Sequence, residues 1–128
     1  MQRPQVELPR AVFVYGSLMP GGTRWSVLKP HAVRRQPATA RGRLYDTGHG
    51  FPAAIFDLDG HDIPGVLVDI RPDAWDSAVR ILDRIEAEGE LYRRVDVVTS
   101  HGPAIGYQWL LSTEGVRPLP SGWRPIVP

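Results

Sequence analysis

The chain has 128 residues, of which 42% are hydrophobic and 23% are charged. This length suits one domain, and the composition excludes a disordered chain and a membrane protein, because no apolar run approaches the ~20 residues that cross a bilayer. A formal net charge of +1 and the absence of cysteine exclude a basic nucleic-acid-binding surface, disulfides and thiolate chemistry. We expect no nucleic-acid or membrane partner. The first ten residues contain no apolar segment of a secretory signal, so we expect a cytoplasmic protein.

The first half of the chain predicts a leader followed by strands and tight turns. Residues 1–10 contain two prolines among mixed polar groups and are expected to be a flexible leader. Residues 11–15 (AVFVY) are continuously apolar, which favours a buried strand. The segment 23–28 has room for a short helical turn. Further strands are expected at 38–45, 53–58 and 63–70, the last two separated by the turn-rich DGHD at 59–62.

One helix is strongly predicted. Asp73 follows Pro72 and is expected to be its N-cap. Apolar residues then recur at the spacing of one helix face, and Gly89 is a natural end. The apolar positions are Trp75, Ala78, Val79, Leu82 and Ile85.

The second half of the chain predicts a hairpin and a tail. Residues 91–99 and 104–112 are expected to be two strands joined by SHGP at 100–103. The segment 116–128 is rich in proline and tryptophan, and we expect it to pack along the surface without forming an element. The domain is therefore expected over 11–115. More strand than helix in this order indicates an α+β fold, either a curled sheet or a small barrel.

One acidic residue falls on the apolar face of the predicted helix. At about 100° per residue, Glu86 lies within roughly 20° of Trp75 and between Val79 and Leu82. Burial and the negative end of the helix dipole both raise the pKa of a carboxyl group, toward the range useful for proton transfer. The alternative is that the helix has frayed before Glu86, which leaves this side chain in solvent.

The corner after the first strand is the second notable feature. Gly16 permits backbone conformations that other residues avoid, and successive N–H groups in such a turn can form an anion-binding concavity. Ser17 adds a hydroxyl group. The alternative is an ordinary turn that ends a strand. The pattern of a Walker phosphate-binding loop is absent.

These two features stand in motifs that match a known family. FVYGSL at 13–18, followed later by LDRIE at 82–86 and LYRR at 91–94, resembles the γ-glutamylcyclotransferase-like, or AIG2-like, family. The middle strands of that family are matched by GRLY at 42–45, FPA at 51–53 and PGVL at 64–67. The resemblance extends over residues 11–112, almost the whole expected domain.

The resemblance implies a fold and an activity. The fold would be a small mixed β-barrel flanked by one main helix and short helical turns. The reaction would convert a γ-glutamyl amine or γ-glutamyl peptide into 5-oxoproline and a free amine by intramolecular aminolysis, with Glu86 as general acid and base. The family also implies that the backbone of Tyr15, Gly16, Ser17 and Leu18 binds the γ-glutamyl group. Neither a metal nor another cofactor is expected.

Tyr92 has two interpretations. The family implies that its hydroxyl group lies near the reacting atoms, whereas its position at a strand start also suits an aromatic of the barrel with an exposed tip. The four histidines, at 31, 49, 61 and 101, lack the close pairing of metal ligands.

The sequence departs from the family pattern in ways that bear on the substrate. Ala87 stands where a glycine is common after the glutamate, and Arg24 and Trp25 stand where an asparagine or histidine is frequent. Besides the enzyme, two hypotheses remain: a non-catalytic small-ligand binding module of the same fold, and a subunit whose tail docks a partner. The protein is expected to be a monomer or a homodimer.

Overall fold

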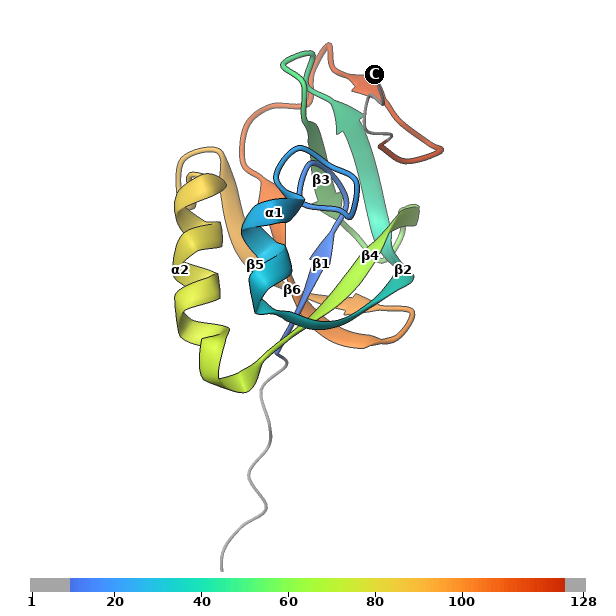
Figure 1. Ribbon diagram of the computed structural model, residues 1–128. Helices are drawn as coiled ribbons and strands as arrows, with labels where there is room; N and C mark the ends of the chain where they lie inside the picture. Colours follow the sequence, from blue (N-terminus) through green and yellow to red (C-terminus); the bar gives the residue numbers. More distant parts are fainter. Residues whose placement is uncertain (1–9, 124–128) are drawn as a thin grey trace, which may run out of the picture.

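A computed structural model describes residues 10–123 of the chain (Figure 1). The expected leader lies outside the described residues except for Arg10, as does the end of the tail, 124–128. The elements are β1 (Ala11–Val14), α1 (Trp25–Leu28), η1 (Lys29–His31), β2 (Ala32–Asp46), β3 (Pro52–Phe56), β4 (His61–Ile70), η2 (Pro72–Ala74), α2 (Trp75–Ile85), β5 (Tyr92–Thr99), β6 (Gly102–Trp109) and β7 (Arg117–Pro118).

Five of the strands close into a barrel. They follow the order β2-β4-β1-β6-β5, and the pairing of Ala40 with Thr99 joins β5 back to β2. β1 is antiparallel to β4 and parallel to β6, while β3 and β7 extend the sheet from β2. The predicted α+β fold with a small mixed barrel and one main helix is confirmed.

The position of β1 explains its unbroken apolar sequence. Alternate side chains of a strand point to opposite faces of the sheet. Phe13 packs with residues of the other barrel strands inside the barrel, whereas Val12 packs in a second core together with Leu82 of α2. All four residues of β1 are buried, because one face meets the barrel interior and the other is covered. Figure 1 shows α2 beside the barrel, on the side of β5.

The predicted helix is present but shorter than expected. It spans Trp75–Ile85, and Ala74 rather than Asp73 is its N-cap, with no side-chain cap. Pro72 begins a preceding 3-10 turn that already includes Asp73, so the exposed Asp73 carboxylate is no longer at the capping position. The helix ends before Gly89 because the chain reverses at Ala87, which has a φ of 47°.

Two strand predictions are corrected by long-range pairing. β2 begins at Ala32 rather than at residue 38, because its first half pairs with β4 from Ala32 opposite Ile70 onward. The tail forms an element after all, since Arg117 and Pro118 pair with Asp46 and Tyr45 of β2. The predicted hairpin through 100–103 is confirmed as β5 and β6. Within residues 10–123, no helix is long and apolar enough to cross a membrane.

Candidate active site

A cavity of about 70 Å³ lies between the end of β1, the end of α2 and the start of β5. It brings together every site residue that the sequence predicted: Tyr15, Gly16, Ser17, Leu18, Glu86 and Tyr92. Its other walls come from segments far apart in the sequence. They are Phe13, Val14, Arg24, Phe51, Pro52, Ile85, Leu91 and Tyr107.

The turn after β1 forms one wall of this cavity. The carbonyl groups of Gly16 and Ser17 accept hydrogen bonds from the N–H groups of Met19 and Arg24, at 3.0 and 2.8 Å, and these bonds hold the turn in shape. The N–H groups of Gly16, Ser17 and Leu18 themselves have no acceptor within residues 10–123. Gly16 and Leu18 are buried and Ser17 is half-buried. Because unpaired buried N–H groups are rare in proteins, these donors are suited to a ligand oxygen.

Gly16 is required for a different reason than expected. Its φ is not in the left-handed region, so conformational freedom does not explain it. A Cβ atom at this position would lie 2.7 Å from Cγ of Pro52, closer than any real contact. The glycine therefore lets β3 approach the turn and close one wall of the cavity.

Glu86 lies at the end of α2 with its side chain in the cavity. The helix ends one residue earlier, yet the N–H group of Glu86 still donates to the Leu82 carbonyl at 2.9 Å. The residue therefore keeps the helical direction, and the carboxylate is not left in solvent. Burial raises the pKa of Glu86 to about 7, and the positive charge of Arg24 acts in the opposite direction. A carboxyl group with this pKa can both accept and return a proton near neutral pH.

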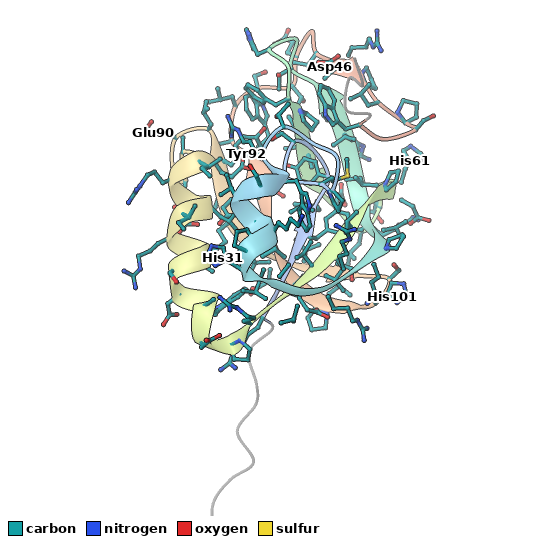
Figure 2. The ribbon with its side chains drawn as sticks, in the orientation of Figure 1. His31, Asp46, His61, Glu90, Tyr92 and His101 are labelled. Atoms are coloured by element: carbon teal, nitrogen blue, oxygen red, sulfur yellow. The ribbon has the colours of Figure 1, made fainter. Side chains whose placement is uncertain are left out.

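Tyr92 lines the cavity and is also part of the core. Its hydroxyl group donates to the carbonyl oxygen of Pro52 at 2.5 Å, and its ring packs against Trp109 at a centroid distance of 5.2 Å. The residue is buried, so it has no exposed tip. Burial, together with the nearby Glu86, raises the pKa of Tyr92 well above its usual value. Figure 2 shows Tyr92 close to α1, on the side of the barrel that faces α2.

Tyr107 and Asp83 form a support that the sequence did not reveal. The hydroxyl group of Tyr107 donates to Asp83 Oδ1 at 2.7 Å, while Arg94 pairs with the other carboxylate oxygen. The carbonyl oxygen of Tyr107 accepts the hydrogen bond of the Tyr15 hydroxyl group. Together these bonds connect α2 to the turn after β1 across β6. Asp83 stands three residues before Glu86 in the LDRIE motif. This helical spacing was the one signal in the sequence that could have placed Asp83 beside the site.

The histidines lie outside this arrangement. In Figure 2, His31, His61 and His101 are at separate places around the molecule. No group of three or more His, Asp and Glu side chains in the described part of the chain is arranged to hold a metal ion.

The comparison with known families agrees with the geometry. The family described as "Gamma-glutamyl cyclotransferase, AIG2-like" matches residues 12–124. The chain belongs to this family. As an AIG2-like protein it has the predicted order of motifs, and the match also includes the start of the tail. The sequence matches none of the curated proteins.

Solved structures share the AIG2-like fold at low sequence identity. The uncharacterized protein PH0828 from Pyrococcus horikoshii is 21% identical, with a TM-score of 0.65, over 87% of this chain and 86% of that one. An AIG2-like protein from Mus musculus is 19% identical, with a TM-score of 0.67, over 88% and 86% of the two chains. YtfP from Escherichia coli is 24% identical, with a TM-score of 0.59, over 87% and 92%.

Proposed function

We propose that this protein is a γ-glutamylcyclotransferase-type enzyme that converts a γ-glutamyl amine or small γ-glutamyl peptide into 5-oxoproline and a free amine. One observation carries the proposal. Glu86, with a pKa near 7, lines the same cavity as the turn at 16–18, whose N–H groups have no acceptor among the described residues. Membership of the family supports this reaction class.

The proposed reaction needs one proton acceptor that later becomes a donor. Glu86 removes a proton from the substrate's α-ammonium group, and the neutral amine attacks the γ-carbonyl carbon. A carbon–nitrogen bond of the five-membered ring forms and gives a tetrahedral intermediate. The bond from that carbon to the leaving nitrogen then breaks as Glu86 returns its proton to this nitrogen. The ring nitrogen gives up its second proton to the released amine, which leaves as an ammonium ion. No water is consumed, and the two products together contain all atoms of the substrate.

The cavity would contribute binding and orientation as well as proton transfer. Ring closure is unimolecular, so a site that holds the substrate folded with its amine against the γ-carbonyl lowers the barrier by restricting its conformation. The negative charge on the γ-oxygen in the intermediate needs hydrogen-bond donors, and the N–H groups of Gly16, Ser17 and Leu18 are suitable. The apolar walls, among them Phe51 and Leu91, strengthen these interactions by excluding water.

The test is the release of 5-oxoproline from a panel of γ-glutamyl amines and dipeptides. We expect turnover by the natural protein and a loss of about 100- to 10,000-fold in kcat for Glu86→Gln, which cannot exchange the proton. Glu90→Gln is the matched control, since Glu90 is exposed and points away from the barrel in Figure 2. Full activity of Glu86→Gln would overturn the mechanism. Ligand binding without 5-oxoproline across the panel would instead identify a binding module.

A further inference from the structure

Arg24 is the one charged wall residue that the proposed reaction does not use. Of the residues that line the cavity within 10–123, it is the sole cation, and Glu86 is the sole carboxylate. The backbone of Arg24 is fixed, because its N–H group donates to the Ser17 carbonyl at 2.8 Å and Arg24 is the N-cap residue of α1. Arg24 is therefore bonded to the same turn whose N–H groups bind the substrate in the proposed function.

The guanidinium group of Arg24 is only weakly engaged by the protein. Among residues 10–123 it makes one hydrogen bond, to the Ile85 carbonyl oxygen at the long distance of 3.4 Å. The five ion pairs of the described residues do not include it. A guanidinium group has five N–H donors in a planar fork that matches a carboxylate, so most of its donors remain available.

We propose that Arg24 is the specificity-determining residue of this site and selects γ-glutamyl compounds whose leaving amine carries a carboxylate. This inference rests on the proposed function. Arg24 is exposed, whereas Tyr15, Gly16 and Leu18 are buried, so its charge is at the mouth of the cavity. The glutamyl part must reach Glu86 and the N–H groups inside. The part of the substrate at the mouth is then the leaving amine.

The charges of the site favour an anion over a cation at this position. A leaving amine with a positive side chain would meet Arg24 and be repelled, because like charges in a partly desolvated site raise the free energy. A carboxylate would be attracted, and it would also screen Glu86 from Arg24.

The test compares two substrates that differ only in one charge, γ-glutamylalanine and γ-glutamylalaninamide. We expect the natural protein to convert the acid with a kcat/KM about fivefold higher, the upper effect of a charge pair whose arginine is exposed. In Arg24→Gln the ratio of kcat/KM for the acid to kcat/KM for the amide should fall to about 1, whatever the change in the two absolute rates. Arg80→Gln removes the same charge from an exposed position of α2 and should preserve the preference.

Each other outcome overturns the inference in a distinct way. If Arg24→Gln slows both substrates equally, Arg24 binds the α-carboxylate that they share. If the natural protein converts both compounds equally well, the inference is wrong but the proposed function stands. If no γ-glutamyl compound releases 5-oxoproline, both are wrong.

Discussion

Glu86 and Ala87 are neighbours in sequence, yet their backbones have opposite φ signs. Glu86 has a φ of −84°, and Ala87 has a φ of 47°. The N–H groups of Ala87 and Glu88 donate back to the carbonyls of Arg84 and Asp83, at 3.2 and 2.9 Å, which is the Schellman pattern of a helix end. The left-handed residue turns the chain away immediately after the carboxylate, so Glu86 stays at the cavity.

Ala87→Gly is expected to stabilise the protein. A left-handed conformation costs an alanine roughly 1 kcal/mol relative to glycine, and this strain would be relieved. The free energy of unfolding, measured by urea denaturation, should rise by up to about 1 kcal/mol. Gly89→Ala is the converse control, because Gly89 has a φ of 89° and open space around it, and it should destabilise by a similar amount. A loss of stability in Ala87→Gly would show that the left-handed backbone of Ala87 is not strained.

The rate should depend on the ionisation of Glu86. Only the carboxylate form accepts the substrate's proton, so kcat/KM is expected to fall as the pH drops through about 7, the pKa of Glu86. Because the charge of Arg24 lowers this pKa, Arg24→Gln should move the acid limb to higher pH. Arg80→Gln should not move it. The measurement is a pH profile of kcat/KM with a single γ-glutamyl substrate, and an acid limb near the ordinary value of 4.5 would contradict the burial of Glu86.

Glu86→Gln is expected to be more stable than the natural protein in alkaline solution. The pKa of Glu86 is about 7 when folded and near 4.5 when unfolded, so the folded state binds more protons between these values. Stability from this group is therefore present below about pH 4.5 and is lost as the pH rises through 7. The pKa difference corresponds to at most about 3 kcal/mol.

The two proteins should be compared by thermal unfolding at pH 5 and pH 8. The advantage of the glutamine variant should be large at pH 8 and small at pH 5. Glu90→Gln controls for the loss of one surface charge. Equal stability of Glu86→Gln and the natural protein at pH 8 would show that the carboxylate is solvated.

Tyr107→Phe tests the connection between α2 and the turn after β1. The change removes the donor to Asp83 Oδ1 and leaves this oxygen, in a partly buried site, without its partner. We expect a loss of about 1–2 kcal/mol in the free energy of unfolding. Arg41→Gln breaks an exposed pair with Asp62 and should cost less than about 1 kcal/mol. If both variants lose the same small amount, the Tyr107 bond has no structural role.

Local patterns predicted the elements whose burial follows a simple period. β1 is buried on both faces, so its residues are all apolar, and α2 has one apolar face that packs against the barrel. The first half of β2 could not be recognised this way. Arg34, Arg35 and Pro37 are exposed, and they are in a strand because β4 pairs with them. Such pairing depends on a segment far along the chain.

The same distinction holds for the candidate site. The helical position of Glu86 was predictable, because the spacing from Trp75 to Leu82 fixes the face. The sequence predicted that position 16 needs glycine, but it did not predict the reason, because Pro52 approaches from another strand. Tyr107 was missed for the same reason: its role depends on bonds to Asp83 and Tyr15, which belong to different elements.

The place of β1 between β4 and β6 has a consequence for the newly made protein. The turn after β1 leaves the ribosome early, but the cavity walls at Glu86, Tyr92 and Tyr107 are synthesised at least 68 residues later. β1 also lacks one of its two neighbouring strands until β6 has emerged. A nascent chain that stops short of β6 therefore contains the turn and Glu86, but it lacks Tyr107 and the strand that pairs with β1. The barrel closes around the cavity only when translation of the domain is nearly complete.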